Sequence, residues 1–259
     1  MVREPGAALL GRLESSRGAR MSVGVAIVCK TPTAGASKTR LSPALRPEEC
    51  MMISACFIRD LARTIQSLVD DGDVAGYAVY TPLGSEAALQ PLLPRGFKLL
   101  PQGDGDLGAR LLKATTDLLA AGHAGAILVN SDSPTLPRSI LRAAVDAVRR
   151  QDNIVLSPAL DGGYILVGLS KAHARPFEDI PWSTNAVHAL TLRRAGEIGL
   201  PVASVPAWYD VDDEVSLRML ESELRGEQPA GIATLGAGAD APATRQFLRE
   251  RLAASVPGR

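Results

Sequence analysis

The acidic residue that follows a predicted core strand, Asp132, is the first candidate for chemistry in this sequence. It lies in the segment N-S-D-S-P (130–134), directly after the apolar run G-A-I-L-V (125–129). A breaker-free run of small and β-branched residues is typical of a buried parallel strand. Ligands of open α/β sheets collect at the carboxyl ends of such strands, where a carboxylate suits a hard cation such as Mg²⁺. The alternative is that Asp132 only caps the next helix or shapes a turn.

A second acidic cluster, Y-D-V-D-D (209–213), precedes a helix-like stretch that starts at Glu214. Asp213 is well placed to cap that helix. Asp210 and Asp212 are two residues apart, so they point to the same side of an extended segment. Two such carboxylates repel each other unless a cation lies between them. Together with Asp132, they predict a metal site made of three carboxylates.

A basic loop, K-T-P-T-A-G-A-S-K-T-R-L (30–41), follows the first predicted strand. Its small residues let backbone N–H groups approach a phosphate, and Lys38 and Arg40 add cationic donors. Lys30 can serve in the same way. The Gly-Lys-Ser/Thr ending of a Walker A loop is missing. Because the loop is expected at the same sheet edge as Asp132, phosphate binding is favoured over the alternative of a solvated basic loop.

The segment G-D-G-D-L-G (103–108) matches the G-x-G-x-x-G pattern of dinucleotide sites. It follows a middle strand instead of the first strand of a βαβ unit, and its two aspartates would oppose a pyrophosphate. The dinucleotide interpretation, and with it an oxidoreductase, is therefore disfavoured. Gln102, Gly103 and Gly108 are instead candidates for contact with a base, because the amide of Gln102 both donates and accepts and glycines allow close approach.

Two further segments are candidates for substrate binding. Asp161, Gly162 and Gly163 join two predicted strands, and the simplest interpretation is a hairpin turn. Ser183 and Thr184 precede a predicted helix, and one of them is expected to be its N-cap. The N-terminus of a helix can also hold an anionic group of a substrate.

The pattern of apolar residues predicts an alternation of strands and helices. The expected strands are 23–28, 75–81, 97–100, 125–129, 154–157, 164–169 and 202–205. One helix is expected to start at residue 47, and further helices are expected at 85–93, 107–121, 138–150, 185–198 and 214–224. Such an alternation predicts an α/β fold with a parallel or mixed sheet that helices cover on both faces.

The chain of 259 residues, 46% of them hydrophobic, can bury one sizeable core. We expect one domain at 21–225, a disordered extension at 1–20, and a Gly/Ala/Pro-rich linker followed by a short helix at 226–259. The formal net charge is zero and aromatic residues make up 4%, which argues against nucleic acid as a partner. No apolar run is long enough for a membrane span. Three cysteines without metal spacing predict free thiols and a cytoplasmic protein.

Five motifs in this order resemble the DUF2064 proteins: K-T-P-x-x-G-x-x-K-T-R-L, G-D-L-G-x-R-L, N-S-D-S-P-T-L-P, P-A-L-D-G-G-Y-I-L-V-G-L and W-Y-D-V-D-D. The resemblance covers about residues 21–225. It implies the three-layer α/β/α, Rossmann-like fold of the nucleotide-diphospho-sugar transferases (glycosyltransferase type A), with a mostly parallel mixed sheet. The first and last motifs are also similar to those of the 2-phospho-lactate guanylyltransferases, which have Asp-Gly-Gly-Thr-Asn where this chain has Tyr164 and Ile165 after the glycines.

The resemblance also implies roles for the candidate residues. Lys38 and Arg40 would hold a diphosphate or triphosphate, and Asp132, Asp210 and Asp212 would bind Mg²⁺ or Mn²⁺. The segment 102–108 would lie near the base and 161–163 near the second substrate.

These observations predict a metal-dependent transferase that uses an activated nucleotide and a small-molecule acceptor. Nucleotidyl transfer from a nucleoside triphosphate to a phosphate or carboxylate is the first hypothesis, because the basic loop suits a triphosphate. Glycosyl transfer from a nucleotide sugar is the second, and a non-catalytic nucleotide-binding module is the third. The oligomeric state stays open, with a homodimer as one candidate assembly.

Overall fold

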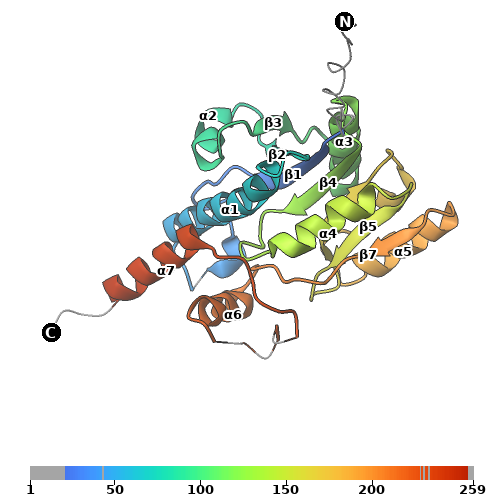
Figure 1. Cartoon of the computed structure of the whole chain (residues 1–259). Helices are drawn as coiled ribbons and strands as arrows, with labels where there is room; N and C mark the ends of the chain where they lie inside the picture. Colours follow the sequence, from blue (N-terminus) through green and yellow to red (C-terminus); the bar gives the residue numbers. More distant parts are fainter. Residues whose placement is uncertain (1–20, 43, 228, 230, 233, 256–259) are drawn as a thin grey trace, which may run out of the picture.

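The structure, a computed structural model, describes residues 21–42, 44–227, 229, 231–232 and 234–255. The extension predicted at 1–20 lies outside the described residues. Figure 1 shows a layered molecule in which helices cover a central sheet.

The sheet has seven strands in the order β3-β2-β1-β4-β6-β5-β7. Their bounds are β1 (Val23–Lys30), β2 (Val74–Thr81), β3 (Lys98–Pro101), β4 (Gly125–Asn130), β5 (Ile154–Pro158), β6 (Tyr164–Leu169) and β7 (Val202–Ser204). Only β6 runs antiparallel to its neighbours, β4 and β5. All seven predicted strands are confirmed, and so is the mostly parallel mixed sheet.

Alternating side chains of the central strands enter two separate cores. In β1, Val25 and Ile27 belong to one core, while Ala26 belongs to the other. In β4, Ile127 and Leu128 are divided in the same way. Both faces of these strands are therefore buried, which explains why their sequences are continuously apolar.

Helices form the two outer layers. They are α1 (Pro47–Val69), α2 (Glu86–Leu89), α3 (Leu107–Ala120), α4 (Arg138–Val148), α5 (Val187–Glu197), α6 (Glu214–Leu224) and α7 (Pro242–Ser255). Apolar residues of α1, α4, α6 and α7 enter the first core, and those of α3 and α5 enter the second. Figure 1 shows α1 and α4 side by side in front of the sheet. The three-layer α/β/α prediction is confirmed.

The C-terminal segment is packed against the domain wherever the structure describes it. Ile232 and Ala241, in the predicted linker, are buried. The N–H of Ala239 donates to the carbonyl oxygen of Thr135 at 2.8 Å. Helix α7, which begins at Pro242, is the short C-terminal helix that the sequence predicts, and it lies along α1. Residues 234–255 therefore share the core of the domain.

The three cysteines, Cys29, Cys50 and Cys56, are free and buried, which confirms the prediction of free thiols. Burial raises the pKa of Cys29 to about 12 and that of Cys56 to about 11, so both are protonated at neutral pH. Among the described residues, no helix combines the length and the apolar character needed to cross a membrane.

Candidate functional site

The fold brings the two acidic motifs and the basic loop to one edge of the sheet. β1 and β4 are parallel neighbours, with Val28 paired to Asn130, so the loop after β1 and the turn after β4 meet at the carboxyl edge. The N–H of Val211 donates to the carbonyl oxygen of Asp132 at 2.9 Å. This bond fixes the 209–213 segment against the turn at 130–134.

The ammonium group of Lys38 lies at the centre of this arrangement. Its Nζ is 2.8 Å from Asp132 Oδ1 and 3.1 Å from Asp212 Oδ1, and it donates to the carbonyl oxygen of Val211 at 2.6 Å. The side chain is only 7% exposed, and the ammonium lies 5.6 Å from the ring centroid of Phe57. Three oxygen atoms from two distant segments thus converge on one buried cation.

Arg40 reaches the same cluster from the solvent side. Its Nη2 is 2.6 Å from Asp212 Oδ2, and its side chain is 71% exposed. The backbone of the acidic segment is held by α6, where Asp213 accepts from the N–H of Ser216 at 2.8 Å as the N-cap. The predicted cap is confirmed. Asp212 is therefore free of a capping role and directs its carboxylate to Lys38 and Arg40.

Asp210 is the most perturbed carboxyl group of the site. Burial raises its pKa to about 7, with further contributions from the negative charges of Asp212, Asp161 and Asp132. Asp161 comes from the turn between β5 and β6, where its Oδ1 accepts from the N–H of Gly163 at 2.9 Å. Four carboxyl groups are therefore close enough at this edge of the sheet to influence one another, and two of them, Asp132 and Asp212, contact the cations.

The predicted metal triangle is only partly visible in this arrangement. Within the described ranges, no group of three or more His, Cys, Asp or Glu side chains is placed so that it could hold a metal ion as it stands. The ammonium of Lys38 instead lies between Asp132 and Asp212. The donor atoms are all oxygen, which suits Mg²⁺ or Mn²⁺, and they already surround a cation. The residues fit a divalent ion in chemistry, and the metal role of Asp132, Asp210 and Asp212 stays a prediction.

Lys30, the last residue of β1, does not join this cluster. Its exposed Nζ donates to the carbonyl oxygen of Ala36 at 3.2 Å, which closes the loop between them. Within that loop, the N–H of Thr33 donates to Ser37 Oγ at 2.9 Å. These bonds shape the segment that leads into Lys38, which has a left-handed backbone with φ of 50°.

Gln102 has a structural role that its sequence position does not reveal. Its Nε2 donates to the carbonyl oxygens of Cys29 and Val79, at 2.9 and 3.2 Å, and so ties β1 to β2 at their carboxyl ends. Only its Oε1 is left to contact a ligand, and Arg110 Nη1 lies 3.5 Å from that atom. A base edge would thus meet an acceptor at Gln102, not a donor.

The G-D-G-D-L-G pattern is explained by the start of α3. Asp106 is the N-cap and accepts from the N–H of Ala109 at 2.9 Å. Gly103 has φ of 78°, which favours glycine. At Gly108, a Cβ atom would lie 2.4 Å from the carbonyl oxygen of Phe177, so the glycine allows α3 to pack against that segment.

The segments at 161–163 and 183–188 lie together at the same edge. Gly162 has φ of 93°, a Cβ atom there would lie 2.2 Å from the carbonyl oxygen of Asn185, and the carbonyl of Gly162 accepts from the N–H of His188 at 2.9 Å. The N-cap prediction for Ser183 or Thr184 is wrong. The helix α5 starts at Val187, after a turn in which Ser183 has φ of 65° and Thr184 Oγ1 donates to Pro181.

Arg110 also lies near this edge of the sheet, although it was not among the residues predicted for the site. Besides Gln102, it contacts the carbonyl oxygen of Gly105 through Nε at 3.0 Å. It therefore places a further cation near the carboxyl edge of β1 to β3. The sequence could have indicated this residue, because Arg110 is the arginine of the G-D-L-G-x-R-L motif. The carbonyl of Val211 was also missed, and no side-chain pattern could have indicated it.

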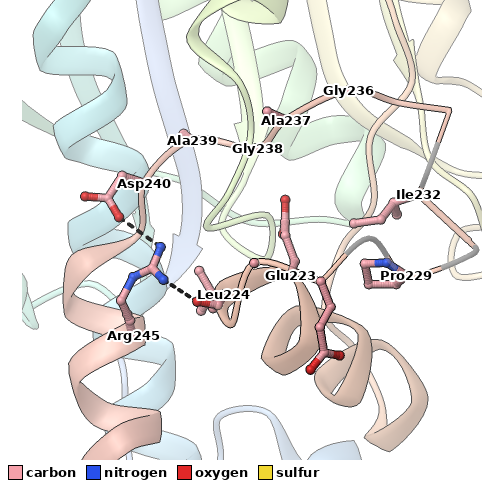
Figure 2. Close-up of a pocket in the computed structure, with 12 residues that line it drawn as sticks. Glu223, Leu224, Pro229, Ile232, Gly236, Ala237, Gly238, Ala239, Asp240 and Arg245 are labelled. Atoms are coloured by element: carbon pink, nitrogen blue, oxygen red, sulfur yellow. Dashed lines mark hydrogen bonds and ion pairs between the residues drawn. The ribbon is translucent and has the colours of Figure 1, made fainter.

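A separate pocket of about 320 Å³ lies between α6 and the start of α7 (Figure 2). Arg245 lines one side of it, with Nη2 3.2 Å from Asp240 Oδ1 and a hydrogen bond to the carbonyl of Leu224. Glu223 also lines it and accepts from the hydroxyl of Tyr209 at 2.5 Å. None of the residues predicted for the functional site lines this pocket.

Comparison with solved structures assigns the fold. A protein from Desulfovibrio desulfuricans G20, provisionally described as a nucleotide-diphospho-sugar transferase, is 25% identical, with a TM-score of 0.74 over 90% of this chain and 96% of its own. A cytidylyltransferase from Leptospira borgpetersenii is 11% identical, with a TM-score of 0.53 over 90% and 96% of the two chains. 4-Diphosphocytidyl-2C-methyl-D-erythritol synthase from Anaerococcus prevotii is 8% identical, with a TM-score of 0.50 over 79% and 99%.

No curated protein matches the chain. A family model, described as "Uncharacterized protein conserved in bacteria (DUF2064)", matches residues 64–184, which include the 103–108 pattern, the turn at 130–134 and the hairpin at 161–163. The predicted resemblance is confirmed: residues 64–184 match the DUF2064 family model, and the chain has a fold similar to that of nucleotide-diphospho-sugar transferases.

Proposed function

We propose that this chain is a transferase that uses an activated nucleotide, and that it moves a nucleotidyl group from a nucleoside triphosphate to a small phosphorylated or carboxylate acceptor. The observation that carries the proposal is the meeting of Lys38 and Arg40 with Asp132 and Asp212 at the carboxyl edge of β1 and β4. Ligands of open α/β sheets bind at this edge. The proteins of similar structure, described as transferases, support the same class of reaction.

In the proposed reaction, an anionic oxygen of the acceptor attacks the α-phosphorus of the triphosphate. A bond from that oxygen to the α-phosphorus forms, the bond from the α-phosphorus to the bridging oxygen breaks, and pyrophosphate leaves with the electron pair. An anionic acceptor carries no proton that must be removed, so no general base is required. Lys38 and Arg40 stabilise the negative charge on the phosphates, and the protein mainly positions the two reactants.

Asp132, Asp210 and Asp212 would hold a divalent ion, Mg²⁺ or Mn²⁺. When bound, this ion neutralises charge on the phosphate oxygens. The segment 102–108, with Arg110 beside it, would contact the base side of the nucleotide. Asp161, Gly162, Gly163, Ser183 and Thr184 would face the second substrate, because their segments lie together at the same edge.

Glycosyl transfer from a nucleotide sugar is the second candidate. The Desulfovibrio protein favours it, because that protein is provisionally described as a nucleotide-diphospho-sugar transferase and is similar over 90% of this chain. In that reaction the same cationic groups would stabilise a departing nucleoside diphosphate. A non-catalytic nucleotide-binding module would keep the binding residues and show no turnover of either kind of donor.

The test begins with thermal stabilisation of the protein by each nucleoside triphosphate, with and without Mg²⁺, because a ligand that binds the native state raises its apparent stability. The nucleotide that binds is then incubated with a panel of phosphorylated and carboxylate acceptors, and pyrophosphate release is measured. Pyrophosphate release that depends on acceptor supports nucleotidyl transfer. Turnover of nucleotide sugars without pyrophosphate release supports glycosyl transfer, and binding without any turnover contradicts both.

A further inference from the structure

The ammonium of Lys38 lies between the two acidic motifs. It is surrounded by Asp132 Oδ1, Asp212 Oδ1 and the carbonyl oxygen of Val211, at 2.8, 3.1 and 2.6 Å. The side chain is buried, at 7% exposure, whereas the side chains of Asp132 and Asp212 are 31% and 29% exposed. The carboxylates therefore shield the ammonium and are themselves reachable from solvent.

This arrangement conflicts with the role of a phosphate ligand as long as Lys38 stays in place. The ammonium donates to the carbonyl oxygen of Val211 and to Asp212 Oδ1, and it forms an ion pair with Asp132 Oδ1, so its charge is engaged by protein oxygens and is not directed to a nucleotide. Arg40 differs, because its side chain is 71% exposed while its guanidinium pairs with Asp212. A buried ammonium that satisfies its acceptors can contact phosphate only after it leaves them.

We propose that Lys38 is a built-in cation that neutralises the Asp132–Asp212 site in the nucleotide-free protein and exchanges with the divalent ion that enters with the nucleotide. This inference rests on the proposed function, since it assumes that the site receives a divalent ion and phosphates. On exchange, the ammonium leaves the two carboxylates and becomes available for the phosphates. One residue thereby keeps the carboxylates from repelling each other before binding and supplies a cation after it.

The exchange has a consequence that does not involve turnover. A divalent ion that binds without nucleotide must displace the ammonium, so removal of the ammonium should strengthen binding of that ion. Removal of any positive charge nearby would also strengthen it through longer-range electrostatics. Arg40 measures this second effect, because it contacts the same Asp212 from outside and does not lie between the two carboxylates.

The test is a titration of the full-length protein with Mn²⁺ in the absence of nucleotide, with free Mn²⁺ followed by electron paramagnetic resonance. The variants are Lys38→Met, which keeps an apolar stem over Phe57, Arg40→Met as the matched control, and Lys171→Met as a remote one. Lys38→Met is expected to bind Mn²⁺ at least about tenfold more tightly than Arg40→Met, a ratio that corresponds to ~1.4 kcal/mol. Equal affinities of these two variants, or no Mn²⁺ binding by Lys38→Met, would overturn the exchange.

A second measurement uses the wild-type chain and so does not depend on the folding of a variant. Lysine acetylation by an N-hydroxysuccinimide ester, followed by mass spectrometry, reports how accessible each ammonium is. Lys38 should be protected in the free protein and become more reactive as Mn²⁺ is added without nucleotide, because the displaced ammonium then has no phosphate to bind, whereas the exposed Lys171 should not change. Protection of Lys38 that persists at saturating Mn²⁺ would contradict the proposal.

The two proposals can fail separately. If wild-type protein releases pyrophosphate but Lys38→Met and Arg40→Met bind Mn²⁺ equally, the exchange is rejected and the nucleotidyl transfer stands. If Lys38→Met binds Mn²⁺ much more tightly but no nucleotide donor is turned over, the exchange stands and the reaction is rejected.

Discussion

The N–H of Val211 donates a hydrogen bond to the carbonyl oxygen of Asp132 at 2.9 Å, and this one bond joins the two acidic motifs of the chain. The carbonyl of the same Val211 accepts from Lys38 Nζ at 2.6 Å. Val211 itself is fully buried, so its packed side chain helps to fix both of these backbone groups. A backbone group thus aligns three segments that are far apart in the sequence, and it fixes which side chains share the site.

Substitution of Asp210 by Asn should separate stability from function. Asp210 is buried near Asp132, Asp161 and Asp212, so its charge is opposed by burial and by repulsion. Asn removes the charge and keeps the shape. We expect the melting temperature to rise by about 2–4 °C, which corresponds to ~1 kcal/mol for a domain of this size. We expect pyrophosphate release to fall by about 100-fold, because the substitution removes a carboxylate that is proposed to hold the divalent ion.

Scanning fluorimetry at pH 7.5 measures the first effect and the pyrophosphate assay the second. Asp146→Asn, an exposed substitution on α4, is the matched control and should change neither quantity. A lower melting temperature for Asp210→Asn would show that its carboxylate is stabilising, against the argument from charge repulsion.

Two helical glycines should respond to alanine with opposite signs. At Gly108, a Cβ atom would lie 2.4 Å from the carbonyl oxygen of Phe177, and backbone cannot easily move away. At Gly196, nothing lies within 4 Å of the Cβ position. Gly108→Ala should lower the free energy of unfolding by about 1–3 kcal/mol through overpacking. Gly196→Ala should raise it by up to ~1 kcal/mol through helix propensity.

Urea denaturation of both variants measures the difference. If Gly108→Ala were as stable as the wild type, the start of α3 would not be tightly packed against the segment at 177. That result would also weaken the structural explanation of the G-x-G-x-x-G pattern.

The central strands of this fold could be predicted from the sequence because they are short, mostly buried apolar runs, whereas the edge strands β3 and β7 are partly exposed. The turn after β4 was also predictable, since Asp132 is an acidic residue directly after such a run. The strand order was not, because pairing of β1 with β4 depends on contacts between distant segments. The start of α5 was missed because Ser183 and Thr184 look like caps but form a separate turn.

The composition of the site was predictable, but its internal pairing was not. Lys38, Arg40, Asp132 and Asp212 are chemically suited to phosphate and metal, and the structure brings these four together. The sequence alone could not show that Lys38 pairs with the carboxylates themselves. It also could not show that the amide of Gln102 is used to tie β1 to β2, because its acceptors are backbone carbonyls.

The docking of α7 should depend on Asp60. This buried side chain of α1 accepts from the N–H groups of Ala243 and Thr244, at 3.0 and 2.8 Å, and from Thr244 Oγ1 at 2.6 Å. Asp60→Ala leaves these donors buried without a partner and should lower the free energy of unfolding by about 1–3 kcal/mol. Asp60→Asn keeps one oxygen acceptor and should have a smaller effect.

The rate of hydrogen exchange of the α7 amides measures how firmly α7 is held against α1. Asp60→Ala should speed their exchange more than that of the α4 amides, which do not contact Asp60. Thr244→Val is the matched control, because it removes the hydroxyl and keeps the N–H. Unchanged exchange in α7 would mean that its apolar contacts with α1 are sufficient to hold it.

The last prediction concerns acid stability and a cluster on the side of the domain opposite the site edge. Asp73, in the turn before β2, is 3.0 Å from Arg142 Nη1 and 2.6 Å from Arg149 Nη1 through Oδ2. Burial raises the pKa of its carboxyl, but hydrogen bonds from Arg142 and Arg149 outweigh this and hold the pKa below its usual 3.8. Asp73→Asn should therefore lower the free energy of unfolding by about 2 kcal/mol at neutral pH.

The sign of the pH dependence follows from the lowered pKa. In the unfolded chain the carboxyl takes up its proton near pH 3.8, and in the folded protein only at lower pH. Its stabilisation is thus complete above the unfolded pKa and is lost as the pH falls through the folded one. Urea denaturation should show the full difference between wild type and Asp73→Asn at pH 7 and a shrinking one below pH 4. Asp152→Asn, whose cationic partner Lys171 is 69% exposed and whose other partner is His173, should show a smaller difference at pH 7, of at most ~1 kcal/mol. A difference for Asp73→Asn that stayed constant down to pH 3 would mean that packing, and not the ion pairs, is what the substitution removes.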